Sequence, residues 1–433
     1  MDARVIRVKE KSAHLGTLAV ILTLWTLPGL AGETPIGGTV NDLLSYAREH
    51  NPDLRSQRLD AEAQRERIEP ASALADPKFQ MELMDFTNAM TPAKSASLTP
   101  GDVGATRYRA IQELPFPGKR GLRGEIAQAQ AAQSDSMRDA TWLDIEFRIR
   151  TAYARYFQAA GQARIQREAL QLIDALERLV LKRYSVGLVP QQDALQVQGE
   201  STRLKVDLVE SERRRREAGA LLNTLLPRDA DAPLAEPTGL SPIPDPPALA
   251  QVFARARATS PDLGRERQGV TAAEKSKELT YLNRYPDFAL ALTNNRPRSA
   301  MIGPETWDVM VEVNIPLQQS SRRAQEREAE RRLEAARERV TATEARLNGL
   351  LGTTLAALKA SRDKAQLLRE TLLPQAKATL DAAQAGYESG RVNFNTVIDA
   401  ERQILRTRLA LLDAEVDASV RHAELEQLLG APL

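Results

Sequence analysis

The chain has 433 residues, a formal net charge of +1 at pH 7 and no cysteine. A net charge near zero argues against a nucleic-acid partner, because such a partner requires a clustered basic surface. The lack of cysteine excludes disulfides, thiolate metal sites, cysteine nucleophiles and a lipidated N-terminal cysteine.

The N-terminus has the features of a secretory signal peptide. An apolar run covers residues 15–27, and Gly29 and Ala31 offer small residues for cleavage. The run follows four basic residues: Arg4, Arg7, Lys9 and Lys11. It is shorter than the about 20 residues that a spanning helix needs, and no later stretch approaches that length. We therefore predict that residues 1–31 are removed on export and that the mature protein has no transmembrane helix.

The mature chain opens with two predicted helices and then two strands. The expected ranges are about 39–50 and 51–74 for the helices and about 77–85 and 106–115 for the strands. In the first strand Phe79, Met81 and Leu83 alternate with polar residues, which is the pattern of a strand with one apolar face. The second strand is less regular, because Arg107 and Arg109 fall among its apolar residues.

A helix hairpin completes this half of the chain, over about residues 119–226. The helix from Lys119 to Tyr184 spans about 66 residues, which at 1.5 Å per residue is roughly 100 Å. Gly187 then breaks the pattern as a left-handed C-terminal cap does, and Pro190 fits the first turn of a return helix. A helix of this length is too long for a compact globular domain.

The chain contains a duplication. Residues 184–196 align without a gap with 387–399, at an offset of 203 (387 − 184), and residues 51–79 align with 260–288. A fixed period of similarity predicts repeated structural units. The predicted boundaries are 32–226 for the first repeat, 227–247 for a Pro-rich connection and 248–433 for the second repeat, with strands at about 286–316 and a helix hairpin at about 322–429.

Pro374 distinguishes the second repeat from the first, because it lies inside the second long helix where the first repeat has Gln171. A proline inside a helix removes one hydrogen bond and bends the helix. We therefore expect a helix bend at Pro374 that brings the tip of this hairpin toward the axis of an assembly.

The strand pairs predict a membrane barrel that several chains share. In a membrane the edges of a sheet must be closed, and the smallest barrels have about eight strands. Four predicted strands per chain are too few. A dimer would give eight strands and a filled lumen, whereas a trimer would give twelve and room for a channel.

These features together resemble the TolC family of outer membrane efflux proteins. The resemblance is carried by the order of the elements and by three kinds of motif: the repeated Tyr-x-x-Gly turns, the openings Asn51-Pro52-Asp53-Leu54 and Ser260-Pro261-Asp262-Leu263, and the stretch Pro115-Phe116-Pro117-Gly118-Lys119-Arg120. It implies a mainly α fold with a membrane β-barrel, as a homotrimer of twelve strands and a twelve-helix periplasmic tunnel. It also implies outer membrane lipid around the barrel, a periplasmic adaptor protein and an inner-membrane pump, of the RND type.

The resemblance also assigns roles to individual residues. Asp399 matches a pore-lining aspartate, and three copies would form a ring of negative charge. Thr396 stands where a companion acid is expected, and Arg391 lies one position before the expected arginine, which is Val392 here. The implied periplasmic gate is completed by Tyr387 and Asp193, and the implied adaptor-docking tips are Gly187, Leu188 and Gly390.

Simpler interpretations stand beside these roles. Asp399 is also explained as a solvated helix residue. Met81, Met84 and Met90 suit a soft metal, but ordinary apolar strand and loop residues explain them better. His50 and His422 have no ligand spacing around them. We therefore expect no metal site, no cofactor and no enzymatic activity.

Two classes of function remain. The first is a passive exit duct of a tripartite efflux system, or of a type I protein-secretion system; the second is an exported coiled-coil scaffold without a pore. The Phe116 to Arg120 stretch is similar to members that serve heavy-metal resistance pumps. Metal ions, organic drugs and exported proteins are therefore the expected cargoes, in that order.

Overall fold

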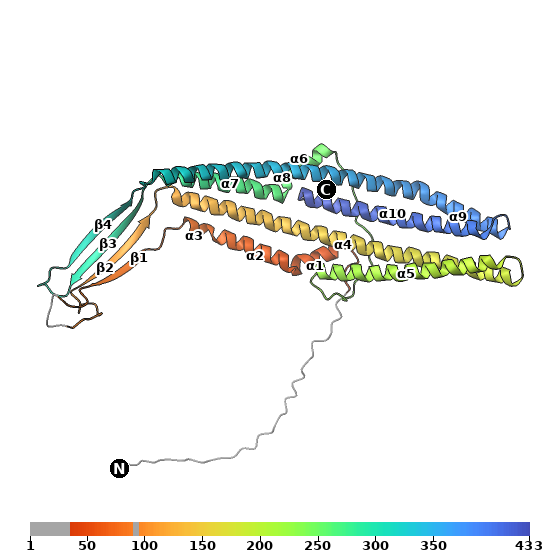
Figure 1. Cartoon of the computed structure of the whole chain (residues 1–433), viewed down its shortest axis with the longest axis horizontal. Coiled ribbons are helices and arrows are strands. Elements are labelled where there is room, and N and C mark those ends of the chain that lie inside the picture. The colour runs from red at the N-terminus through yellow and green to blue at the C-terminus, as the bar shows by residue number, and fades with distance from the viewer. Residues whose placement is uncertain (1–34, 90–94) are drawn as a thin grey trace, which may run out of the picture. The chain divides into compact units, whose positions relative to one another are not determined.

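The structure, a computed structural model, describes residues 35–89 and 95–433. The chain divides into two units, Met1–Pro35 and Ile36–Leu433, and the second unit contains all the elements described below (Figure 1). The predicted signal peptide and Met90 lie outside the described residues.

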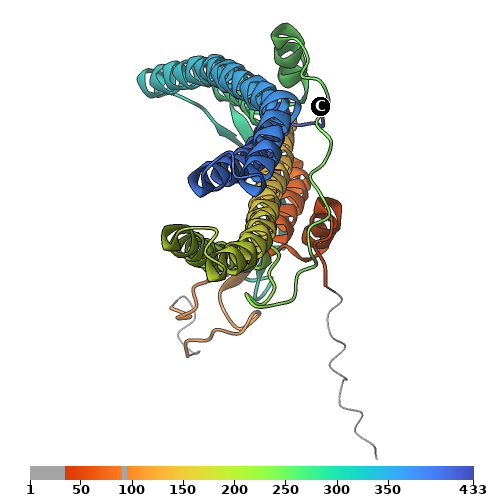
Figure 2. The same ribbon diagram turned by 90° about the vertical axis from the view of Figure 1, so that its right-hand side faces the viewer.

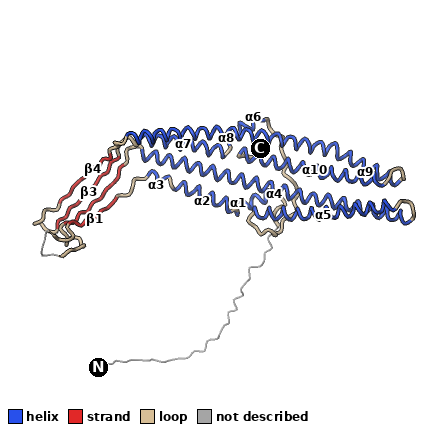
Figure 3. The backbone as a smooth tube through the Cα atoms, viewed as in Figure 1, coloured by secondary structure: helices blue, strands red, loops and turns tan. Residues whose placement is uncertain are grey.

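Helices dominate the second unit (Figure 3). The helices are α1 (Val40–His50), α2 (Pro52–Glu66), α3 (Ile68–Ser72), α4 (Lys119–Ser185), α5 (Gln191–Leu225), α6 (Leu249–Thr259), α7 (Pro261–Leu282), α8 (Gln319–Leu367), α9 (Leu373–Glu388) and α10 (Phe394–Leu429). The strands are β1 (Lys78–Met84), β2 (Ala105–Leu114), β3 (Asp287–Pro297) and β4 (Thr306–Asn314). None of the described helices carries an apolar stretch that would cross a membrane. The predicted fold class, long helix hairpins combined with paired β-hairpins, is confirmed.

Side-chain caps determine where several helices begin. Thr39 Oγ1 accepts a hydrogen bond from the Asp42 N–H, and the Asp42 carboxylate accepts one from the Thr39 N–H, each at 3.3 Å. Asn51 Oδ1 accepts a hydrogen bond from the Leu54 N–H at 3.0 Å, and Asn393 caps α10 in the same way. These helix starts are therefore encoded locally.

One helix that the sequence predicts as continuous is interrupted. The helix expected over about 51–74 breaks at Arg67 into α2 and α3. Pro70 accounts for the break, since it has no N–H for the carbonyl of Glu66 and its ring would collide with that carbonyl. Accordingly, α2 ends at Glu66.

The long helix expected over about 322–387 is interrupted as well. A π-helical turn, Leu368–Leu372, separates α8 from α9. Pro374 follows this turn by two residues, and in a regular α-helix its ring would collide with the carbonyl of Glu370. A wider turn accommodates the proline without ending the helix. The sequence thus located the proline but not the π-helical turn that accompanies it.

The four strands of the described residues form one antiparallel sheet in the order β1-β2-β3-β4. The two hairpins are joined through β2 and β3, where Ala110 lies opposite Leu292. In the next pair, Leu292 lies opposite Val309. Both outer edges of the sheet, on β1 and β4, lack a strand partner within the described chain.

The strand register separates apolar from polar side chains. We call the first surface the apolar face; its apolar residues are Phe79, Met81, Leu83, Tyr108, Ala110, Leu114, Phe288, Leu290, Leu292, Trp307, Val309, Val311 and Val313, and Thr106, Gln112 and Asn294 are polar residues on the same side. The opposite, polar face carries Arg107, which pairs with Glu82 at 3.0 Å, and Arg109, which donates to Thr293 at 3.3 Å. Both arginines that made β2 irregular in the sequence therefore lie on the polar face.

The helices run side by side, with shorter helices placed end to end. α4 packs against α5 and α7, and α8 packs against α7 and α10 (Figures 1 and 2). At the α5–α2 junction, Asn51 Nδ2 donates to the carbonyl of Leu225 at 3.5 Å. At the α10–α7 junction, Thr259 Oγ1 donates to the carbonyl of Leu429 at 2.5 Å. In each half of the chain, a polar side chain next to the start of a helix thus donates to a carbonyl at the end of the return helix.

Candidate functional site at the hairpin tips

The two helix hairpins end in turns that share their hydrogen bonds. The N–H of Gly187 donates to the carbonyl of Tyr184 at 2.9 Å, and the N–H of Gly390 donates to the carbonyl of Tyr387 at 3.1 Å. The two glycines have φ angles of +75° and +70°. In this region a side chain is strained and glycine is favoured. The turn is therefore repeated in structure as it is in sequence.

The predicted docking residues lie at these tips. Leu188 follows Gly187 and is 73% exposed, and the neighbouring Val186 is 66% exposed. Exposed apolar side chains grouped on one turn are typical of a contact surface. Adaptor docking by Gly187, Leu188 and Gly390 remains a prediction.

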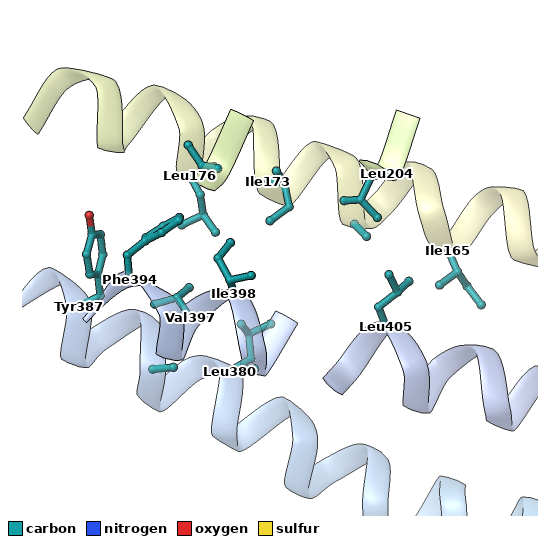
Figure 4. Close-up of a cluster of buried hydrophobic side chains, with 14 of the residues drawn as sticks. Ile165, Ile173, Leu176, Leu204, Leu380, Tyr387, Phe394, Val397, Ile398 and Leu405 are labelled. Carbon is teal, nitrogen blue, oxygen red and sulfur yellow. The ribbon is translucent and has the colours of Figure 1, made fainter. Parts of the chain in front are cut away.

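An apolar core joins the two hairpins behind the tips (Figure 4). The first hairpin contributes Ile165, Ile173, Leu176 and Leu204, and the second contributes Leu380, Tyr387, Phe394, Val397, Ile398 and Leu405. The Tyr387 and Phe394 rings lie 5.3 Å apart, and Phe394 is fully buried. The tips are therefore held together by side-chain packing.

Tyr387 lies at the contact between the hairpins. Arg183, on α4, donates through Nη1 to the carbonyl of Tyr387 at 3.2 Å and through Nη2 to the carbonyl of Glu388 at 3.1 Å. Its guanidinium carbon lies 5.4 Å from the centre of the Tyr387 ring. The Tyr387 hydroxyl is buried, and among the described residues it has no hydrogen-bond partner of good geometry.

Tyr387 and Asp193 influence each other electrostatically. Burial, and then the Asp193 carboxylate, raise the pKa of Tyr387. Burial also raises the pKa of Asp193, and the Tyr387 hydroxyl opposes that shift. The structure therefore brings these two predicted gate residues together, although their contact falls short of a well-formed hydrogen bond.

The other predicted gate residues lie elsewhere on the tip. Asp399 has a 76% exposed side chain, and its carboxylate lies 4.0 Å from Arg402. The Thr396 hydroxyl donates to Asn393 at 2.9 Å and thus belongs to the cap of α10. Arg391 is exposed, and the arginine that contacts Tyr387 is Arg183 instead.

An ion pair with a buried carboxylate and partly exposed arginines crosses between the hairpins one turn further from the tips. Arg402 on α10 donates to Oε2 of Glu200 on α5, at 2.6 and 3.1 Å, while Arg203 binds Oε1. The Glu200 side chain is 2% exposed. Burial raises the pKa of Glu200, but the hydrogen bonds from the two arginines outweigh burial, so this pKa lies below its ordinary value.

Glu401 lies beside this pair. It is 1% exposed, and neither carboxylate oxygen has a hydrogen-bond partner among the described residues. Burial, followed by the negative charge of Glu200, raises the pKa of Glu401 to about 7. A glutamate with a raised pKa, Glu401, therefore lies beside one with a lowered pKa, Glu200, in the same apolar seam.

Arg183, Glu200 and Glu401 were missed in the sequence. A signal existed for the two glutamates, since Glu200 interrupts the apolar spacing from Val197 to Leu204 and Glu401 interrupts that from Val397 to Leu405. For Arg183, the only signal in the sequence was its position next to Tyr184. The carbonyls that Arg183 binds belong to the other hairpin. The spacing of residues along the chain does not reveal this contact.

The described histidines belong to no cluster of metal-binding side chains. Within the described residues, no group of three or more histidine, aspartate or glutamate side chains could hold a metal ion. Met81 lies on the apolar face of the sheet, opposite Tyr108. His422 lies 3.8 Å from Glu426, an ion-pair geometry rather than a ligand set.

Comparison with known proteins gives concordant matches. A protein-family model described as "Outer membrane efflux protein" matches residues 43–227 and 252–431. The cobalt-zinc-cadmium resistance protein CzcC of Cupriavidus metallidurans is 25% identical over 408 residues, which cover 90% of each chain.

Two solved structures share the fold. The outer membrane protein VceC of Vibrio cholerae superposes with a TM-score of 0.75 at 18% identity, over 91% of this chain and 96% of that chain. A crystal structure of CusC, solved in relation to its folding and transmembrane channel formation, superposes with a TM-score of 0.74 at 19% identity, over 90% of this chain and 92% of that chain.

Proposed function

Since this chain belongs to the outer membrane efflux protein family, we propose that it is the exit duct of a tripartite efflux system. Its membership confirms the resemblance drawn from the sequence and assigns the chain to the outer membrane. In the proposal the chain carries out no catalysis, and substrates pass through it passively from a periplasmic adaptor and an inner-membrane pump of the RND type to the exterior.

The sheet is the observation that carries the proposal. Its apolar face is exposed: Val309 is 77% and Trp307 is 65% exposed, and all nine residues of β4 are exposed in the single chain. In lipid, backbone groups at a sheet edge must be paired, so an open four-stranded sheet is not viable alone. Pairing β4 of one subunit with β1 of the next closes the sheet, with the apolar face toward lipid and the polar face toward a lumen.

A homotrimer satisfies this requirement and leaves a channel. Three such sheets give twelve strands, which exceeds the about eight that side chains fill completely. The helix hairpins then line up beneath the barrel as a periplasmic tunnel of twelve helical columns. The hairpin tips, with Gly187, Leu188 and Gly390, form the end that docks to the adaptor.

The tips also form the gate in this proposal. Three copies of Asp399 around the axis form a ring of negative charge, which Arg402 reduces because it lies 4.0 Å away. Tyr387 and Asp193 hold the second hairpin against the first, with Thr396 and Arg391 on the exposed side of the tip. The π-helical turn before Pro374 sets the direction of the last part of the hairpin.

Metal ions are the proposed cargo. Two observations support them: the similarity to a cobalt-zinc-cadmium resistance protein over most of both chains, and the Phe116 to Arg120 stretch after β2. A duct takes much of its selectivity from the pump behind it. Crosslinking the protein in cells to identify the neighbouring pump therefore tests the cargo independently of conduction.

The duct is tested by its assembly and conduction. Outer membranes should yield heat-modifiable trimers, and the purified trimers should conduct ions when inserted into planar lipid bilayers. A monomeric particle, or a trimer that inserts and never conducts, would contradict the duct. A scaffold without a pore would instead be recovered as a water-soluble periplasmic rod.

A further inference from the structure

The end of α9 is capped by a side chain from the other hairpin. The last carbonyls of a helix carry partial negative charge and have no donor within the regular helix, although the Tyr387 carbonyl also accepts from the N–H of Gly390 in the turn. Arg183 supplies both a charge and a fork of donors to two successive carbonyls, Tyr387 O at 3.2 Å and Glu388 O at 3.1 Å. A planar guanidinium suits such paired acceptors better than a lysine amine does.

The first hairpin caps the second in this way, but within the described residues the second hairpin makes no equivalent contact with the first. The position equivalent to Arg183 in the second hairpin, 203 residues later, is Gly386, which has no side chain to reach back. A Cβ added at Gly386 would lie 3.0 Å from Val392 Cγ2, so this position is also closely packed. Tyr184 is 43% exposed, whereas its counterpart Tyr387 is 5% exposed. The cap is therefore a specific contact between hairpins rather than a general property of the repeated turn.

The first hairpin also supplies the only arginine that the structure places against Tyr387 among the described residues. Val392 is apolar and half-buried, and Arg391 is exposed. Arg183 remains half-buried and places its guanidinium carbon 5.4 Å from the centre of the Tyr387 ring. A cation over an aromatic face adds to the two hydrogen bonds.

We propose that Arg183 is the clasp of the gate: a positioning residue through which the first hairpin fixes the end of α9 and holds the second hairpin closed. This inference rests on the proposed function, since it names the contact that regulates the same tip. Opening requires the end of α9 to move away from α4, so both hydrogen bonds and the ring contact are lost in the open state. Any change that weakens these contacts of Arg183 therefore favours the open state.

The clasp is tested in the full-length trimer by comparing three variants with the wild type. Arg183→Met should raise the ratio of open to closed channel about tenfold in planar bilayers, which corresponds to about 1.4 kcal/mol. Arg183→Lys keeps the positive charge but loses the paired N–H donors of the guanidinium. Its ratio of open to closed channel should therefore lie between those of Arg183→Met and the wild type. Lys182→Met, which removes the same charge from the adjacent exposed residue, should behave like the wild type.

Amide hydrogen exchange separates this inference from the proposed function. Arg183→Met should speed exchange at residues 386–392 while the thermal midpoint of the trimer stays unchanged, and this result supports the clasp even if the wild type does not conduct. Unchanged exchange and an unchanged open-to-closed ratio in Arg183→Met would overturn the clasp. So would an equal effect of Lys182→Met. Absence of conduction in the wild type alone would overturn the duct.

Discussion

Glu401 is a carboxylic acid buried in the apolar seam between the hairpins, where water cannot solvate its charged form. The groups near it are Glu200 and Arg203 on α5 and Arg402 on α10. Both arginines already bind Glu200. Glu401 therefore bears the cost of burial with little compensation, and its pKa rises from 4.5 to about 7.

This raised pKa predicts that stability falls as the pH rises. Between about pH 4.5 and 7 the folded protein keeps the proton on Glu401 while the unfolded chain releases it, so folding is most favoured at the acid end of this window. Above the folded pKa the loss is complete, and it amounts to at most about 3 kcal/mol. Glu401→Gln removes the titration. Its thermal midpoint should depend less on pH between about 5 and 8 than that of the wild type.

Asp399→Asn is the matched control for this pH dependence, because Asp399 has an exposed side chain two residues away. It should leave the pH dependence of the midpoint unchanged. Equal pH dependence in Glu401→Gln and the wild type would show that Glu401 does not titrate in this window.

The sequence could identify Asp399 but not Glu401. Asp399 matches a motif position of the family that the sequence resembles, whereas the role of Glu401 depends on which face of α10 is buried. That face is set mainly by the packing of α10 against α4, α8 and α9, and α4 lies more than 200 residues earlier in the chain. The same reason explains Arg183, whose carbonyl acceptors belong to a different hairpin.

At the scale of elements, the helix junctions fix how the columns are assembled. Gly430 ends α10 with a φ of +77° and lies against the start of α7. A Cβ built at Gly430 would lie 2.4 Å from the carbonyl oxygen of Thr259. The position therefore requires glycine both for its backbone conformation and for the close approach of another backbone.

Gly430→Ala is accordingly predicted to be strongly destabilising, by at least about 2 kcal/mol, because alanine is strained at this φ and the backbone of Thr259 must move. Gly349→Ala is the matched control, since Gly349 lies inside α8 and an added Cβ meets nothing within 4 Å in the chain. It should be neutral or stabilising by up to about 1 kcal/mol. Thermal unfolding of the two variants checks the pair, and a wild-type midpoint for Gly430→Ala would contradict the junction.

Helix ends were more predictable than helix interruptions. Thr39, Asn51 and the tip glycines act through neighbours a few residues away, so their effects can be read along the chain. Pro70 and Pro374 were visible too, but the same residue type ends α2 four residues upstream in one case and produces a π-helical turn in the other. The residue type alone therefore does not predict which of these two outcomes follows.

On the scale of the whole molecule, the sheet is the element through which the proposed trimer would assemble. The alternation in β4 was plain in the sequence, whereas β2 was irregular until the register placed Arg107 and Arg109 on the polar face. Cross-strand pairing, rather than the pattern within one strand, thus establishes a sheet with two chemically distinct faces. In the proposed trimer this sheet closes against the sheets of neighbouring subunits, so its two free edges are explained only by the assembly.

Adjacent residues of β4 test this closure. Val311 lies on the apolar face and Met310 on the polar face. If the apolar face meets lipid, Val311→Lys should destabilise the trimer by about 2–4 kcal/mol, depending on its depth in the bilayer. Met310→Lys places the same charge in an aqueous lumen and should be tolerated. The amount of heat-modifiable trimer in the outer membrane measures both effects. If both lysine variants are tolerated equally, the apolar face does not contact lipid. The two positions are neighbours on one strand and differ in whether lipid or water surrounds them.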